Sequence, residues 1–295
     1  MIAQLSGILL PVFILAAVGY AWQKRGVPFE REFVTRMVLN ISGPCLIVDT
    51  LSQLSMPRGE FISLLFAATA LFVGTVVVAW LVLQSTGLSI RSYLPALAIG
   101  NTGNLGLPLC LFAFGQEGLG FAVAVYVTNS VGQFTLTPML QSNESPWRTL
   151  MTTPVVYGAV IGLLVMFLDI PLPQWLDSSI GLLGSLMIPL MLLALGNTLG
   201  ELRIARLNFA FGWGFVRLAI GFLVGHIVAW SFGLEGVAKG VIILQGTMPA
   251  AVFNYLFAAR YGRAPDDIAG IVLSSTLLSA LLLPLLVGYV LGFGS

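Results

Sequence analysis

Charged side chains are scarce along this chain. Asp, Glu, Lys and Arg make up 8% of its 295 residues, whereas a soluble globular protein carries about 25%. The formal net charge is only +1, so its electrostatics favour neither nucleic acid nor any other highly charged partner. The composition therefore excludes an ordinary soluble domain and predicts no nucleic-acid binding.

Residues that commonly hold metals or carry out catalysis are scarce as well. The chain has two cysteines, Cys45 and Cys110, both in apolar stretches, and a single histidine, His226. Their spacing matches no zinc, haem or redox motif, and neither HExxH nor GxSxG occurs in the sequence. We therefore expect no catalytic residues, no metal site and no cofactor, and hence no enzyme.

Long hydrophobic runs are abundant instead. A helix needs about 20 apolar residues to cross the ~30 Å hydrocarbon core of a bilayer, and ten such segments recur with only short connections between them. These segments are 4–23, 33–53, 61–84, 90–114, 118–140, 149–168, 176–198, 208–232, 237–260 and 266–291. The pattern predicts an all-α membrane protein with ten transmembrane helices.

The positions of Lys and Arg predict the orientation of these helices. Loops after odd-numbered segments hold ten of the thirteen basic residues, and the even-numbered loops hold only Arg58 and Lys239. Cytoplasmic loops carry an excess of Lys and Arg. We therefore expect the odd-numbered loops in the cytoplasm and both termini outside.

The two halves of the chain resemble each other. A shift of 146 positions superposes "VYVTNSVGQFTLTPML" (125–140) on "IVLSSTLLSALLLPLL" (271–286). Five segments per half is an odd number, so the second copy enters the membrane from the opposite side, an inverted repeat of the kind common in secondary transporters. We expect repeats at 1–140 and 149–295. The polar residues paired by the shift are Asn129 with Ser275, Ser130 with Thr276, and Gln133 with Ser279.

Segments 4 and 9 are both interrupted near their middle. "GNTGNLGLPL" (100–109) and "LQGTMPAA" (244–251) combine glycine with proline, and a shift of 141 positions brings Pro249 onto Pro108. Irregular backbone at membrane depth is tolerated only where it is buried or lines a cavity, so the two breaks predict a substrate pocket at the midplane. The expected substrate-binding residues are Asn101, Thr102, Asn104, Pro108, Gln245, Gly246, Thr247, Pro249 and Asn254.

The chemistry of such a pocket favours an anion. Each interrupted helix resumes with its N-terminus at the midplane, and a helix N-terminus stabilises a negative charge by up to ~2 kcal/mol when partly buried. Two such ends would hold one carboxylate weakly, as a carrier requires. The side chains expected to meet around it are Asn101, Asn104, Gln245 and Thr247.

Further polar residues lie within the apolar segments, and each has two interpretations. Arg217, midway along segment 8, either caps carbonyls of the broken helices or contacts substrate or takes part in coupling. Asp49 is either interfacial or linked to proton transfer. The polar faces of segments 5 and 10 either support the crossing by hydrogen bonds or supply oxygen ligands for Na⁺, and the lack of a nearby carboxylate favours support.

Three stretches carry a resemblance to a known family. "NTGNLGLPL" (101–109), "FGQEGL" (114–119) and "MPAAVFNYLFAARYG" (248–262) resemble the bacterial auxin efflux carrier family. The plant PIN auxin carriers are distant members, and the fold is similar to that of bile acid:sodium symporters. The resemblance implies a scaffold of segments 1, 2, 6 and 7 and a transport domain of segments 3–5 and 8–10. It also implies that segments 4 and 9 cross at unwound centres, elevator-type alternating access, and a homodimer through the scaffold.

These observations together predict a multi-pass protein of the bacterial inner membrane that moves a small organic anion. Malonate-like or auxin-like mono- and dicarboxylates are the substrates that the resemblance implies, and the lipid bilayer is the other expected partner. The alternatives that stay open are a carboxylate symporter coupled to Na⁺ or H⁺, a channel of the same symmetry, and a membrane sensor.

Overall fold

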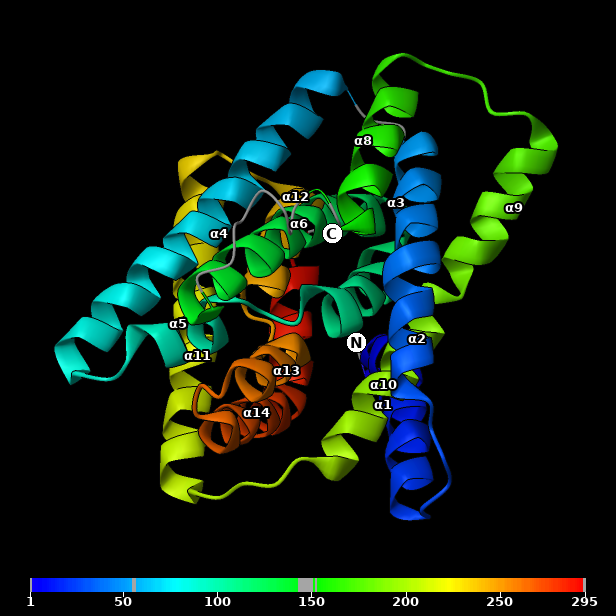
Figure 1. The fold of residues 1–295 in the computed structure, drawn as a ribbon. Coiled ribbons are helices and arrows are strands. Elements are labelled where there is room, and N and C mark those ends of the chain that lie inside the picture. The colour runs from blue at the N-terminus through cyan, green and yellow to red at the C-terminus, as the bar shows by residue number, and fades with distance from the viewer. Residues whose placement is uncertain (1, 55–56, 143–150, 152, 294–295) are drawn as a thin grey trace.

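The structure, a computed structural model, describes residues 2–54, 57–142, 151 and 153–293, and helices dominate it (Figure 1). In this described part, seven helical stretches are long and apolar enough to cross a membrane. The helices are α1 (Ile2–Lys24), α2 (Arg31–Met37), α3 (Gly43–Ser52), α4 (Arg58–Thr86), α5 (Ile90–Ala98), α6 (Leu107–Ser142), α8 (Pro154–Phe167), α9 (Gln174–Ser185), α10 (Met187–Glu201), α11 (Leu207–Ser231), α12 (Gly236–Gly246), α13 (Val252–Tyr261) and α14 (Pro265–Leu291), with the π-helical turns η1 (Val38–Ser42) and η2 (Thr102–Gly106).

Every hydrophobic segment expected from the sequence contains helix. Segment 2 is made of α2, η1 and α3, and segment 7 of α9 and α10. For the sixth segment the structure describes α8, which begins at Pro154, a residue suited to the first turn of a helix. Positions 149, 150 and 152, at the expected start of this segment, lie outside the described residues. Segments 4 and 5 meet at a kink, since Gly115 has a φ of 67° inside α6.

A first group of helices pairs the beginning of the first half with the beginning of the second. Helix α1 packs along α10, and α3 packs along α8, an arrangement that Figure 1 shows at its right-hand side. The contact between α1 and α10 is backbone to backbone, because a Cβ atom added at Gly19 or Gly196 would collide with a carbonyl of the opposite helix. Segments 1 and 2 thus pack against segments 7 and 6.

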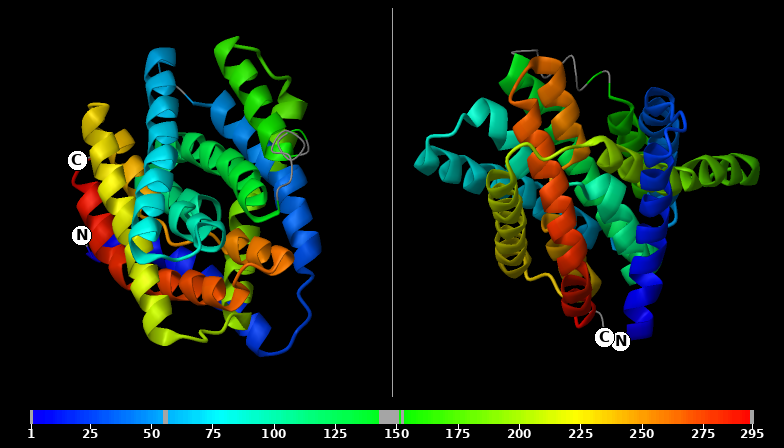
Figure 2. Two further views of the ribbon diagram at one scale, coloured as in Figure 1. Left: turned by 60° about the vertical axis from the view of Figure 1, so that its left-hand side comes forward. Right: turned by 90° about the horizontal axis from the view of Figure 1, so that it is seen from below.

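A second group surrounds the interrupted helices. Helix α4 packs on α5 and α6, α11 packs on α12 and α14, and α4 and α11 touch each other. The same packing therefore occurs in each half. The start of α1 and the end of α14 lie side by side, as both views of Figure 2 show.

Candidate functional site

The two interrupted helices cross in extended conformation. Gly100, after α5, and Ala250, after α12, form an antiparallel bridge. The Asn101 N–H donates to the Pro249 carbonyl at 2.7 Å, and the Ala251 N–H donates to the Ile99 carbonyl at 3.1 Å. Backbone polar groups in hydrocarbon need partners inside the protein, so each break supplies partners to the other.

Polar side chains of α6 and α14 hold the crossing backbone. The Asn129 amide donates to the Gly100 carbonyl at 3.0 Å and to the Thr102 hydroxyl at 3.1 Å. The Ser275 hydroxyl accepts from the Ala250 N–H at 3.1 Å. Asn129 and Ser275 are a pair that the shift of 146 positions superposes, and each supports the unwound backbone of its own half.

Asn254 strengthens the crossing from α13. Its amide donates to the Ile99 carbonyl at 3.1 Å and its oxygen accepts from the Gln133 amide at 3.3 Å. The side chain is 1% exposed. Asn254 therefore links the crossing backbone at Ile99 to Gln133 of α6.

A cavity lies where the two helices resume. On one side it is lined by the first residues of η2, which runs directly into α6, and on the other by the start of α13. No side chain of the described residues caps either helix start, and the first N–H groups of a helix have no acceptor within the helix. The lining residues are Leu39, Gly100, Asn101, Thr102, Gly103, Asn104, Tyr126, Asn129, Ser130, Gln133, Phe134, Met191, Ala251 and Phe253.

Asn101 brings a hydrogen-bond donor to this cavity. Its side chain is 4% exposed, and its Nδ2 atom has no hydrogen-bond partner among the described residues. A buried donor without a partner costs about 1–3 kcal/mol of stability. The unpartnered amide of Asn101 is therefore the feature of the cavity that most directly indicates a ligand.

The cavity is narrow. The volume within which the centre of a water molecule can move is about 20 Å³. This volume is enough for one or two waters. A carboxylate therefore requires the walls to move apart before it can enter. The structure is thus that of a closed crossing.

Arg217 lies on the other side of the crossing, at the ends of the two preceding half-helices. Its Nη1 atom donates to the Leu97 carbonyl of α5 at 3.3 Å, and its Nη2 atom donates to the Gly246 carbonyl of α12 at 3.2 Å. The side chain is 1% exposed. The crossing therefore separates two helix starts at the cavity from two helix ends at Arg217.

Comparison with known proteins identifies the family. The model of the membrane transport protein family matches residues 137–287. The chain belongs to this family of membrane transporters. An uncharacterized transporter of Methanocaldococcus jannaschii is 25% identical over 301 residues, covering 94% of this chain and 96% of the relative. A putative malonate transporter of Rhizobium meliloti is 24% identical over 302 residues, covering 94% and 93% of the two chains.

The plant relative confirms the resemblance to auxin efflux carriers. Auxin efflux carrier component 1 of Arabidopsis thaliana is 30% identical over 143 residues, which cover 45% of this chain and 22% of the plant protein. The chain is thus a multi-pass membrane protein of the transporter family that its sequence motifs resemble.

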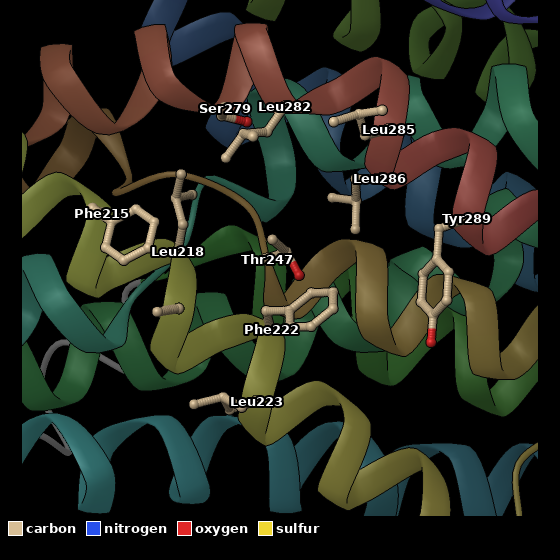
Figure 3. Close-up of a pocket in the computed structure, with 11 residues that line it drawn as sticks. Phe215, Leu218, Phe222, Leu223, Thr247, Ser279, Leu282, Leu285, Leu286 and Tyr289 are labelled. Carbon is tan, nitrogen blue, oxygen red and sulfur yellow. The ribbon is translucent and has the colours of Figure 1, made fainter.

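Not every residue expected at the pocket of this transporter lies in the cavity. The Thr247 hydroxyl donates to the Ile243 carbonyl at 2.7 Å, and the side chain lines an apolar groove between α11 and α14 together with Ser279 (Figure 3). Gln245 is 1% exposed and faces Gly106, where an added Cβ would collide with its amide. Thr247 and Gln245 therefore do not share one pocket with Asn101.

The pairing of the two prolines is not reproduced. Pro249 lies in the crossing stretch and its carbonyl accepts from Asn101, but Pro108 is already the second residue of α6. The bridge joins Gly100 to Ala250 instead. The shift of 141 positions was therefore wrong as a register, because proline is equally compatible with an extended break and with the first turn of a helix.

The remaining expected residues fall into different places. Asp49 is half-buried on α3, where its Oδ1 accepts from the Gln53 amide at 2.8 Å and faces Gly181 of α9. The Thr276 hydroxyl donates to the Val272 carbonyl at 2.7 Å. Neither residue lines the cavity, whereas Ser130 does.

Some residues that line the cavity were not expected from the sequence. Tyr126 and Phe134 lie four residues on either side of Ser130 and so share its helix face, a spacing that could have identified them. Gly103, within the interrupted stretch 100–109, also lines the cavity. Because glycine has no side chain, its residue type did not indicate a binding role. Leu39, Met191 and Phe253 come from distant elements, which only the folded structure brings together.

Proposed function

We propose that this transporter is a secondary carrier for a small organic anion, a mono- or dicarboxylate, and that one carboxylate binds in the cavity at the helix crossing. The observation that carries the proposal is the convergence of two uncapped helix starts and the unpartnered Asn101 amide on one cavity. Asn104 lies at the same wall and adds a second amide.

The electrostatics of the cavity support a single carboxylate. Each helix N-terminus carries about +0.5 elementary charge, so two of them together balance roughly one negative charge. None of the described residues that line the cavity is charged. A densely charged polyanion would therefore lack compensation, whereas a carboxylate would be held weakly enough to be released.

The names of the relatives support the same substrate class. One is a putative malonate transporter and another is an auxin efflux carrier component, and malonate and auxin are both carboxylates. Malonate-like dicarboxylates and auxin-like monocarboxylates are therefore the first substrates to test.

The proposed architecture is ten membrane spans in two inverted repeats, 1–140 and 149–295. Its support is the exchanged packing of α1 with α10 and of α3 with α8, and the recurrence of the same contacts around α4 and α11. Helices α1, α2, α3, α8, α9 and α10 would form a scaffold, and α4–α6 with α11–α14 would form a transport domain that carries the crossing across the membrane in an elevator-type movement. The homodimer through the scaffold stays a prediction.

Counterflow in proteoliposomes tests this function. Vesicles with purified protein and unlabelled malonate inside are diluted into a trace of labelled malonate, and the same is done with a monocarboxylate. A carrier accumulates label transiently by exchange and saturates with substrate. Flux without counterflow would indicate a channel, and no flux of any mono- or dicarboxylate would refute the proposal.

A further inference from the structure

Arg217 is placed where the ends of two half-helices meet. Helix α5 ends at Ala98 and α12 ends at Gly246. The guanidinium donates to a carbonyl in the last turn of each, at Leu97 and Gly246. One buried side chain thus bridges both halves of the inverted repeat at the crossing.

The charge of Arg217 is balanced by these helix ends. The ion pairs found among the described residues join other arginines to carboxylates and do not include Arg217. Each helix C-terminus carries about −0.5 elementary charge, so two of them together match one guanidinium. Backbone carbonyls are a usual partner for an arginine inside a membrane.

The cavity beside Arg217 is small, and the guanidinium already supplies the positive charge there. In transporters with interrupted helices, unwound carbonyls and half-helix ends coordinate the coupling cation. Here the cavity beside Arg217 leaves only about 10 Å³ for the centre of a water molecule, which is room for about one water. Within the described part of the chain, Arg217 is the one charged residue that lines it; Thr75, Thr102, Asn129 and Gln245 supply its other polar side chains.

Glycines make space for the guanidinium. A Cβ atom added at Gly100 would collide with Nη2 of Arg217, and one added at Gly221 would collide with the Gly246 carbonyl and lie 3.2 Å from Nη1. The two glycines come from different halves of the chain. The arginine is therefore seated in a position shaped to its size.

We propose that Arg217 is a built-in cation, meaning that its guanidinium occupies the position where a coupling cation would bind, so that carboxylate transport requires no Na⁺. The part of this inference that concerns transport, that no Na⁺ is required, rests on the proposed function. It also implies that removing the guanidinium creates a binding site for a free monovalent cation, a property that does not depend on the substrate.

The test uses the purified full-length chain and three variants at Arg217. Arg217→Gly removes the guanidinium and opens its space, Arg217→Met fills the space without charge, and Arg217→Lys keeps the charge. Thermal unfolding is measured in Na⁺, in low-millimolar guanidinium, and in N-methylglucamine, which is too large for the site. Malonate counterflow of the parent is measured in the same ions.

We expect the parent to exchange malonate equally with and without Na⁺. Loss of two hydrogen bonds from a charged group should lower the unfolding midpoint of Arg217→Gly by on the order of 10 °C. Guanidinium should restore most of this loss and Na⁺ a part of it. Arg217→Lys should need no added cation, and Arg217→Met should be destabilised and show no rescue, because its side chain fills the position.

Each of three other results would overturn the inference. The first is malonate exchange by the parent that strictly requires Na⁺. The second is an Arg217→Met variant as stable as the parent. The third is an Arg217→Gly variant whose thermal stability no cation restores, including a variant that fails to fold in every ion. If the parent exchanges no carboxylate in any ion, the proposed function fails, but the cation rescue of thermal unfolding still decides the role of Arg217.

Discussion

Gly100 and Ala250 form an antiparallel bridge at the point where two interrupted helices stop. The two extended stretches run antiparallel here. The two positively charged helix starts therefore lie on one side of the bridge, and the two negatively charged helix ends lie on the other. The starts of η2 and α13 face the cavity beside Asn101, and the ends of α5 and α12 face Arg217. In the proposed function these two otherwise costly breaks form an anion-binding cavity, and Arg217 is the cation on its far side.

Replacing Asn129 should weaken the fold. Asn129→Ala removes two hydrogen bonds to the crossing, at the Gly100 carbonyl and the Thr102 hydroxyl, each worth about 1 kcal/mol. We expect the unfolding midpoint of the purified protein to fall by several degrees. Asn101→Ala removes an Nδ2 atom that has no partner among the described residues, so it should not lower the midpoint. Equal stability of the two variants would contradict this assignment.

Two glycines on α11 provide a matched test of packing. A Cβ atom at Gly221 would collide with the Gly246 carbonyl, whereas nothing lies within 4 Å of one at Gly212. Gly221→Ala should therefore destabilise the protein by about 1–3 kcal/mol. Gly212→Ala should be neutral or stabilise it by up to ~1 kcal/mol through helix propensity. Thermal unfolding measures both, and a Gly221→Ala variant as stable as Gly212→Ala would refute the close approach of α11 and α12.

Both termini should lie outside the cytoplasm. The asymmetry of Lys and Arg predicts this side, and the start of α1 and the end of α14 lie side by side. A reporter that is active only in the periplasm, fused after Ser295, should be active. An inactive reporter on well-expressed, correctly inserted protein would reverse the orientation.

Asp49 should not take part in transport. Its carboxylate accepts from Gln53 and faces α9, within the helices proposed as scaffold. Asp49→Asn should retain the malonate counterflow of the parent, with the same pH dependence. If the variant lost counterflow, or if its pH profile shifted, Asp49 would be assigned a role in proton-linked transport instead.

Much of the fold could be predicted from the sequence, because the hydrocarbon core imposes a length on every apolar helix. The shift of 146 positions also identified Asn129 and Ser275 as counterparts, since each lies on a regular helix whose periodicity fixes its face. The register of the crossing could not be predicted. Unwound backbone has no period, so nothing in the sequence indicated that Thr247 would face the α11–α14 groove while Asn101 faces the cavity.

In the proposed function the helix starts and Asn101 hold the carboxylate, and calorimetry of malonate binding to the purified protein measures this directly. Loss of a donor to a charged acceptor costs about 1.5–3 kcal/mol, which corresponds to roughly 10–150-fold in affinity. We expect Asn101→Ala to bind malonate at least tenfold more weakly, and Thr247→Ala, which faces the apolar groove, to bind it like the parent. If Asn101→Ala binds like the parent while Thr247→Ala loses binding, the anion site is not in this cavity.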